Sequence, residues 1–207
     1  MGGWTTKIMD NKEKMLKGKL YRTDDTNLAK LRLRAHKLCQ KYNDTFEDQE
    51  KQRKGILDKL LPNRGKRTFL QGPIFFDYGN FITIGDNFIV NTNLTILDCA
   101  PVKIGNNVMM GPNISLVTPL HPLRYQQRNV KLGEKGIYDF EYAKSIKIED
   151  DCWLASNVTV NGGVRIGSGS VIGANSVVTR NIPKNVLAFG NPCRVIRKIT
   201  IQDNINQ

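Results

Sequence analysis

Aliphatic residues recur every six positions through most of this 207-residue chain. The residues in phase are Ile84, Val90, Ile96, Ile104, Met110, Leu116, Ile148, Leu154, Val160, Ile166, Ile172 and Val178. A period of six matches neither an amphipathic helix nor a single strand. It is typical of a mainly β protein built as a parallel β-helix, in which three six-residue faces close one triangular coil. Because a single coil cannot bury its own aliphatic column, only a stack of coils is stable.

A small residue often follows the aliphatic one, and we expect it to let the chain turn at each corner. These positions are Gly85, Gly105, Gly111, Ala155, Gly167 and Gly173. The phase is interrupted where the step from Ile96 to Ile104 is eight residues. That step predicts a two-residue corner insertion at Val102 and Lys103.

A second interruption is much longer, because 32 residues separate Leu116 from Ile148. One repeat accounts for six of them, so 26 residues are predicted to project from the coil as an inserted loop. A long loop on a rigid scaffold is a favoured place for binding and catalysis. His121 lies at the base of this loop, within the sequence TPLHP.

The first part of the chain, about residues 11–62, is predicted to be helical. Apolar residues three and four positions apart draw one stripe, formed by Leu28, Leu31, Ala35, Leu38 and Tyr42. Asp25 or Thr26 can cap this helix. Thr45 with Asp48 predicts a capping box for a following helix, which Pro62 ends.

These patterns divide the chain into three parts. Residues 1–67 form a helical cap and linker, residues 68–186 form the β-helix with an inserted loop at about 121–145, and residues 187–207 form a C-terminal tail. No apolar run is long enough to span a membrane and no secretory signal is visible, so a cytoplasmic protein is expected. Four cysteines without metal-binding spacing are interpreted as free thiols of a reducing cytosol.

The net charge is +12 and lies mostly in the first part of the chain. Residues 1–67 contain 18 Lys and Arg against 9 Asp and Glu, whereas the remainder contains 13 against 10. Such a balance allows nucleic acid, a membrane surface or a phosphorylated ligand as partner. The aromatic residues do not interleave with the basic ones as in a single-strand binder, so most of this charge is interpreted as a solvated helical face. Neither a nucleic-acid nor a membrane partner is predicted.

The two histidines differ in context. His36 lies within the first long helix, where a surface or packing role is expected. His121 interrupts the repeat, and a positioned imidazole is the usual general base near neutral pH. A β-helical carbonic anhydrase would need several histidine ligands for its metal, and two distant histidines exclude that reading.

Motifs spread over nearly the whole chain resemble those of the hexapeptide-repeat acyltransferases, and within them the maltose/galactoside O-acetyltransferase group. They are KEKMLKGKLY at 12–21, LRLRAHKLCQKYN within 28–43, FDYG at 76–79, NTNLTILD at 91–98, TPLHP at 118–122, IEDDCW at 148–153 and GNPCRVIR at 190–197. The resemblance implies a left-handed coil and a homotrimer with its active sites between subunits. It also implies transfer of acetyl from acetyl-CoA to a hydroxyl of a sugar of the maltose, glucose or galactoside type, without a metal.

The resemblance assigns roles motif by motif. His121 falls on the general base, and Glu141 falls on a further acidic position of the catalytic loop. The acceptor-binding positions are Asp77, Asn91 and Asp98. The positions that bind CoA are Trp153, Ser156, Ala174, Thr179, Arg180, Arg194 and Arg197.

The chemistry suits these residue types. A sugar hydroxyl is a weak nucleophile and needs a base within hydrogen-bond reach. A thioester is already activated, so neither a metal nor a covalent intermediate is required. Carboxylates accept hydrogen bonds from ring hydroxyls, and arginines pair with the phosphates of CoA.

Two residues depart from the galactoside pattern. Cys99 stands where galactoside-type enzymes have a second acidic residue, and Asp77 is closer to the maltose type. The acceptor therefore stays open between a sugar and another small hydroxylated molecule such as an antibiotic. The alternative outside the enzymes is a catalytically silent β-helical scaffold. In that hypothesis Asp77 and Asp98 are turn residues and Trp153 is a stacked aromatic.

Overall fold

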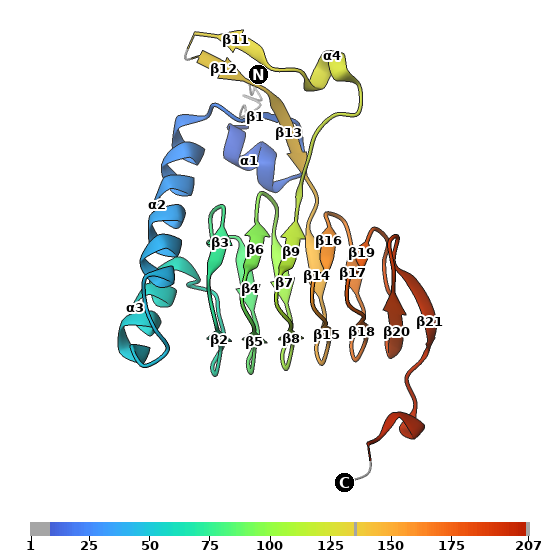
Figure 1. Cartoon of the computed structure of the whole chain (residues 1–207). Coiled ribbons are helices and arrows are strands. Elements are labelled where there is room, and N and C mark those ends of the chain that lie inside the picture. Colours follow the sequence, from blue (N-terminus) through green and yellow to red (C-terminus); the bar gives the residue numbers. More distant parts are fainter. Residues whose placement is uncertain (1–8, 135, 206–207) are drawn as a thin grey trace, which may run out of the picture.

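The structure, a computed structural model, describes residues 9–134 and 136–205. Residues 1–8 of the predicted cap, residue 135 of the inserted loop and residues 206–207 of the tail lie outside the described residues. Stacked three-sided coils form a column, the helices cover its first coil, and the inserted loop rises from one edge (Figure 1). This is the parallel β-helix that the six-residue repeat predicts.

Three parallel sheets form the faces of the column, and each coil passes through them in order. The first face contains β2 (Phe69–Leu70), β5 (Ile89–Val90), β8 (Met109–Met110), β15 (Trp153–Leu154), β18 (Val171–Ile172) and β20 (Val186–Phe189), followed by antiparallel β21 (Arg194–Lys198). The second face contains β3 (Ile74–Phe76), β6 (Leu94–Leu97), β9 (Ile114–Val117), β16 (Thr159–Asn161) and β19 (Val177–Val178). The third face contains β4 (Ile82–Ile84), β7 (Val102–Ile104), β14 (Ile146–Ile148) and β17 (Arg165–Ile166).

The aliphatic residues of the repeat stack in register inside the column. On the first face Val90 pairs with Met110, which pairs with Leu154, and all three side chains are buried. Each fully buried aliphatic side chain stabilises the fold by roughly 1.5–3 kcal/mol relative to its exposed state. Strand β20 continues the first face to Phe189, so the coil extends slightly beyond the predicted boundary at residue 186.

Asparagines, rather than the glycines of the repeat, take the left-handed conformation at the corners. Asn93, Asn113 and Asn157 have φ near +60° and form a ladder, with 2.8 Å from each Nδ2 to the next Oδ1. Asn adopts this conformation because its short side chain forms local hydrogen bonds. The expectation that the small residues make the turn was therefore wrong. A Cβ on Gly105 would lie 2.7 Å from the backbone nitrogen of Asp150, so glycine is needed for close approach of neighbouring coils.

The eight-residue step also has a different origin from the predicted one. Val102 and Lys103 belong to strand β7 and pair with β4 and β14, so they are not the insertion. The additional residues lie in the corner that follows β6, at 98–101. The corner after β3 is extended in the same way, at 77–81.

The helical cap contains α1 (Asn11–Leu16), β1 (Tyr21–Arg22), α2 (Thr26–Asn43) and α3 (Glu50–Leu60). Asp25 caps α2, as predicted, and accepts hydrogen bonds from the backbone nitrogens of Asn27 and Leu28. The predicted capping box at Thr45 was wrong, because the Thr45 hydroxyl donates to the carbonyl of Tyr42 and α3 starts later without a side-chain cap. Buried residues of α2 and α3 join the core of the first coil.

The inserted loop contains β10 (Pro119–Leu120), α4 (Tyr125–Arg128), β11 (Lys131–Gly133), β12 (Gly136–Tyr138) and β13 (Phe140–Ala143). Strand β13 is central, because it pairs antiparallel with β10 on one side and with β1 of the cap on the other. The loop is thus fastened to both the coil and the cap (Figure 1). The tail ends with a short 3-10 helix, η1 (Ile201–Asp203). Within the described residues no helix is long and apolar enough to span a membrane.

Candidate active site

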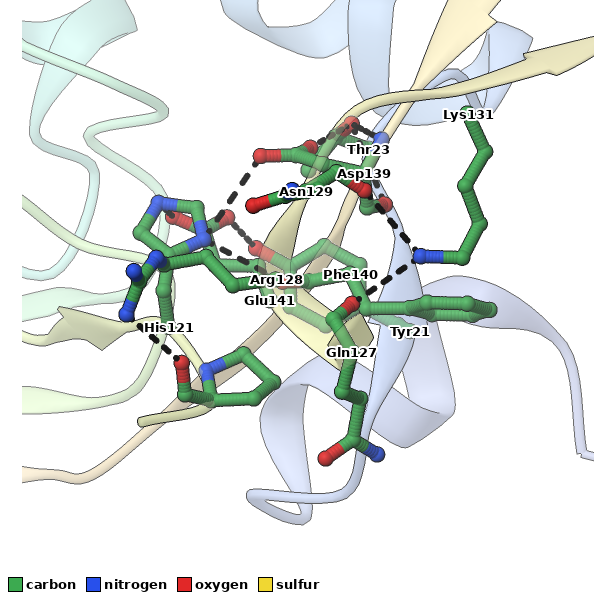
Figure 2. Close-up of polar contacts among 11 residues, drawn as sticks. Tyr21, Thr23, His121, Gln127, Arg128, Asn129, Lys131, Asp139, Phe140 and Glu141 are labelled. Carbon is green, nitrogen blue, oxygen red and sulfur yellow. Dashed lines mark hydrogen bonds and ion pairs between the residues drawn. The ribbon is translucent and has the colours of Figure 1, made fainter. Parts of the chain in front are cut away.

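His121 follows β10 and is held at the base of the inserted loop. Its Nδ1 lies 3.1 Å from the carbonyl oxygen of Phe140 on β13. A carbonyl oxygen can only accept, so Nδ1 donates the hydrogen, and in a neutral imidazole Nε2 is then the acceptor. The side chain is 43% exposed, which leaves this nitrogen reachable by a substrate. Figure 2 shows the imidazole with the carboxylates of the inserted loop around it.

Two carboxylates face the two nitrogens of this imidazole. Asp139 Oδ2 lies 3.5 Å from Nδ1, and Glu141 Oε1 lies 4.0 Å from Nε2. Asp139 immediately precedes β13 and Glu141 lies within it, and both side chains border the imidazole. An imidazolium formed during proton transfer would be stabilised by both charges. No motif of the sequence marks Asp139, and only its place two residues before Glu141 could have pointed to it.

Glu141 is largely buried. Burial raises the pKa of its carboxyl group, and the negative charges of Asp139 and Asp77 raise it further. The Tyr21 hydroxyl donates a hydrogen bond to Glu141 Oε2, which favours the ionised form and opposes the rise in pKa. The other oxygen remains turned toward His121 (Figure 2).

Asp77 lies in the extended corner after β3. Its Oδ2 accepts a 3.5 Å hydrogen bond from Cys99 Sγ, and its Oδ1 lies 3.8 Å from His36 Nε2. Burial raises the pKa of the Asp77 carboxyl group. The ring of His36 packs against Phe75 with centroids 4.8 Å apart, so this histidine has the expected packing role and also borders the corner.

Asp98 is fully buried in the extended corner after β6. Its two oxygens accept hydrogen bonds from the backbone nitrogens of Tyr78, at 2.8 Å, and Phe81, at 3.3 Å. Burial raises its pKa to about 6. Asp98 therefore braces the turn that carries Asp77, and its contact with an acceptor stays a prediction.

The remaining predicted site residues lie on other parts of the column. Asn91, Ser156 and Ala174 are stacked along the edge between the first and second faces, which we call the first edge. Trp153 points outward from the first face and is half exposed. Thr179 and Arg180 follow β19 on the second edge, between the second and third faces, and both are exposed.

Two predicted arginines lie on β21, at the end of the column. Both Arg194 and Arg197 are exposed. The guanidinium of Arg197 forms hydrogen bonds of 2.5 and 2.8 Å with the Asp203 carboxylate, which raises the pKa of Arg197. Arg194 donates to the neighbouring carbonyl of Cys193 at 2.9 Å.

One chain thus brings together only part of the predicted site. The loop base and the second edge hold His121, Glu141 and Asp77, and the charge of Asp77 reaches Glu141. Asn91 lies on the first edge, separated from this cluster by the length of strand β6. No group of three or more His, Cys, Asp or Glu suited to a metal ion occurs among residues 9–134 and 136–205.

Two family models match the chain. Residues 14–65 match the maltose acetyltransferase hexapeptide capping motif, and residues 145–180 match the bacterial transferase hexapeptide repeat. A galactoside O-acetyltransferase of Escherichia coli K12 is 39% identical over 191 residues, which cover 92% of this chain and 90% of that protein. The chain belongs to the hexapeptide-repeat acetyltransferases, in the galactoside and maltose O-acetyltransferase group.

Solved structures of this acetyltransferase group match along the whole column. A galactoside acetyltransferase in complex with coenzyme A superposes with a TM-score of 0.85 at 37% identity, over 95% of this chain and 94% of that one. A maltose O-acetyltransferase from Clostridium difficile 630 superposes with a TM-score of 0.80 at 40% identity, over 93% and 98%. A hexapeptide-repeat acetyltransferase from Vibrio cholerae, complexed with acetyl coenzyme A, has a TM-score of 0.80 at 35% identity, over 93% and 100%.

Proposed function

We propose that this protein transfers the acetyl group of acetyl-CoA to a hydroxyl of a sugar of the maltose, glucose or galactoside type, with His121 as the general base. The observation that carries the proposal is the position of His121, whose Nδ1 is held by the Phe140 carbonyl while Nε2 lies 4.0 Å from Glu141 Oε1 on a side chain that is 43% exposed. The similarity to acetyltransferases solved with coenzyme A and acetyl coenzyme A supports the choice of donor.

The proton and the acetyl group move in opposite directions. His121 Nε2 takes the proton of the acceptor hydroxyl as its oxygen attacks the thioester carbon. A C–O bond forms, and the electron pair of the carbonyl moves onto its oxygen. The tetrahedral intermediate then collapses with cleavage of the C–S bond, and the imidazolium returns the proton to the CoA sulfur. The carboxylates of Asp139 and Glu141 stabilise the imidazolium between these two steps.

Acceptor contacts are proposed at the corner beside His121 and at the first edge. In its ionised form, the Asp77 carboxylate accepts hydrogen bonds from ring hydroxyls and orients the sugar. Asn91 offers an exposed amide for the same purpose. Asp98 is proposed to act indirectly, by holding the turn that carries Asp77, because its oxygens already accept hydrogen bonds from backbone nitrogens of that turn.

The donor is proposed to lie along the exposed positions of the coil and to end at the basic strand β21. Trp153 offers an exposed aromatic surface, and Ser156 and Ala174 are small enough for the slim pantetheine arm to pass. Thr179 and Arg180 lie on the second edge and are proposed to reach the donor that a neighbouring subunit binds along its first edge. Arg194 and Arg197 are proposed to pair with the phosphates. Since Arg197 is bonded to Asp203 in the free chain, binding through Arg197 would require exchange of one partner for another.

We further propose a homotrimer whose active sites lie between subunits. The predicted acceptor residues occupy two different edges of one column, so a neighbour is needed to complete a site. The first face also presents a continuous outward row of apolar residues in register: Phe69, Ile89, Met109, Trp153, Val171 and Leu187. Four of these side chains are between 43% and 53% exposed, which suits a contact with another subunit.

The decisive experiment measures free thiol release from acetyl-CoA with a panel of acceptors. The panel contains maltose, glucose, a galactoside, an aminoglycoside antibiotic and a cell-wall amino sugar. We expect transfer to one or more of the sugars, and a fall of at least about 100-fold in the His121→Ala variant. Equal rates in the two proteins would remove the proposed base. The absence of transfer to every acceptor would favour the silent scaffold.

The proposed compartment is the cytoplasm. All four cysteines are free and buried, as expected for a protein that folds among reduced thiols. Burial raises the pKa of Cys39 and Cys152 to about 11, so neither is a reactive thiolate. Activity should therefore be unaffected by reductants.

A further inference from the structure

Strand β1 of the helical cap lies directly against two carboxylates of the inserted loop. Tyr21 pairs with Glu141 across the antiparallel ladder, and the backbone nitrogen of Thr23 donates to the Asp139 carbonyl at 3.3 Å. Thr23 follows β1 in a turn and Asp139 precedes β13, and the side-chain hydroxyls of Tyr21 and Thr23 bond to the carboxylates of Glu141 and Asp139. The two cap side chains therefore face the two acidic side chains that border His121 (Figure 2).

We propose that Tyr21 and Thr23 are positioning residues of the acetyl transfer reaction, holding Glu141 and Asp139 against the two nitrogens of His121. The inference rests on the proposed function, because it assigns these residues to the same proton transfer. It makes the cap a part of the catalytic apparatus as well as a cover for the first coil.

Tyr21 controls the orientation of the Glu141 carboxylate. The tyrosine side chain is only 1% exposed, and its hydroxyl donates to Glu141 Oε2. Glu141 Oε1 is left facing His121 Nε2 at 4.0 Å. A hydrogen bond to a charged group is among the stronger ones in a protein, so it favours one rotamer of the Glu141 side chain.

Thr23 does the same for Asp139. Its Oγ1 donates to Asp139 Oδ1 at 2.5 Å and accepts from the Asp139 backbone nitrogen at 3.3 Å. Asp139 Oδ2 is left facing His121 Nδ1 at 3.5 Å. Both carboxylates thus have one oxygen fixed by the cap and one directed at the imidazole.

The residue between these two has a separate environment and supplies a matched control. The Arg22 guanidinium forms hydrogen bonds with Asp24 and stacks on the ring of Tyr138 at 3.7 Å. It therefore points away from His121 while sharing the same strand. An Arg22→Gln variant tests whether any change in β1 disturbs the loop.

The first test compares Tyr21→Phe and Thr23→Val with wild type and with Arg22→Gln. We expect kcat to fall about 10- to 100-fold in the first two variants, with KM for acetyl-CoA changed less than about twofold. Thr23→Ser keeps the hydroxyl and should restore most of kcat. Arg22→Gln should retain wild-type kcat. Wild-type kcat in Tyr21→Phe and Thr23→Val would overturn the inference while leaving the proposed function intact.

The pH profile of kcat/KM distinguishes two roles for Tyr21: positioning of the Glu141 carboxylate, or only fastening of the inserted loop to the cap. Five groups from the cap, the corners and the loop surround the Glu141 carboxylate: Tyr21, Cys99, Asp77, His121 and Asp139. The Tyr21 hydrogen bond opposes the rise in the Glu141 pKa, so its removal in Tyr21→Phe should move the limb of the kcat/KM profile that reports Glu141, the limb lost in Glu141→Gln, to higher pH. A tether would lower thermal stability without moving that limb, and an unmoved limb would overturn the inference.

A double-mutant cycle tests whether Tyr21 affects kcat through Glu141. If Tyr21 acts through Glu141, adding Tyr21→Phe to Glu141→Gln should change kcat less than about twofold. Fully additive losses would overturn the positioning role. A wild-type protein that transfers acetyl to no acceptor would overturn the inference together with the proposed function, so the two failures are distinguishable.

Discussion

The buried carboxylate of Asp98 accepts a 2.8 Å hydrogen bond from the backbone nitrogen of Tyr78, twenty residues earlier in the chain. One coil thereby holds the corner of the coil before it, and this corner carries Asp77. The stability of the fold depends on the protonation of this carboxyl group, because burial raises the pKa of Asp98 to about 6 from an ordinary value of 3.8.

The sign of this pH dependence follows from proton binding. Folded Asp98 binds its proton more tightly than unfolded Asp98, so the stabilising contribution is complete below about pH 4 and is lost as pH rises through 6. A shift of about two pKa units corresponds to roughly 3 kcal/mol. We expect urea unfolding at pH 4 and pH 7 to show this loss in wild type relative to Asp98→Asn. In the exposed control Asp48→Asn, the free energy of unfolding should differ between pH 4 and pH 7 by as much as in wild type. The same difference in all three proteins would contradict the raised pKa of Asp98.

Gly105 and Gly55 should respond in opposite directions to the same substitution. A Cβ on Gly105 would lie 2.7 Å from the backbone nitrogen of Asp150 in the next coil. Gly55 lies inside α3 with nothing within 4 Å of the added carbon. We expect Gly105→Ala to lower the free energy of unfolding by about 1–3 kcal/mol and Gly55→Ala to raise it by about 0.5–1 kcal/mol. Denaturant titration measures both, and a stabilised Gly105→Ala would refute the close packing.

Asp139 should matter for catalysis although no motif marked it. Asp139→Asn keeps the shape but removes the charge beside His121 Nδ1, so we expect kcat to fall about tenfold. The control is Asp151→Asn at a left-handed corner, where the neighbouring coil has Asn107 in the same conformation. Steady-state kinetics should leave that control unchanged. An unaltered kcat in Asp139→Asn would exclude a charge effect at this distance.

Arg180 should affect the KM for acetyl-CoA more than kcat. It is exposed at the second edge and is proposed to pair with a phosphate of CoA. Arg180→Ala is expected to raise KM for acetyl-CoA about tenfold with little change in kcat. Arg165→Ala is the control, because Arg165 is paired with Glu149 on the third face. A lower kcat with unchanged KM would place Arg180 elsewhere in the reaction.

The apolar row on the first face should decide the oligomeric state. Met109→Glu puts a charge at the centre of the row, where the native side chain is 53% exposed. We expect wild type to sediment with about three times the chain mass of 23.4 kDa, and the variant to shift toward one. Activity should fall with the trimer if neighbours share a site. A variant that remains trimeric would show that the row faces solvent or substrate instead.

The six-residue period by itself determined the architecture, because a repeat that cannot bury its own aliphatic residues must stack. It also located His121 and the inserted loop, since both interrupt the phase. Local pattern did not reveal which residues turn the corners. Asn93 and Asn113 do so because a side-chain amide satisfies both a left-handed turn and the ladder between coils.

Only the tertiary structure decided what surrounds the imidazole. Tyr21 and Glu141 are 120 residues apart, and no spacing rule connects them. They meet because β13 pairs with a strand of the cap, and strand pairing depends on free edges rather than on sequence distance. Asp98 likewise falls on an acceptor-binding position of its motif, and only the folded chain shows that both of its oxygens accept hydrogen bonds from backbone nitrogens.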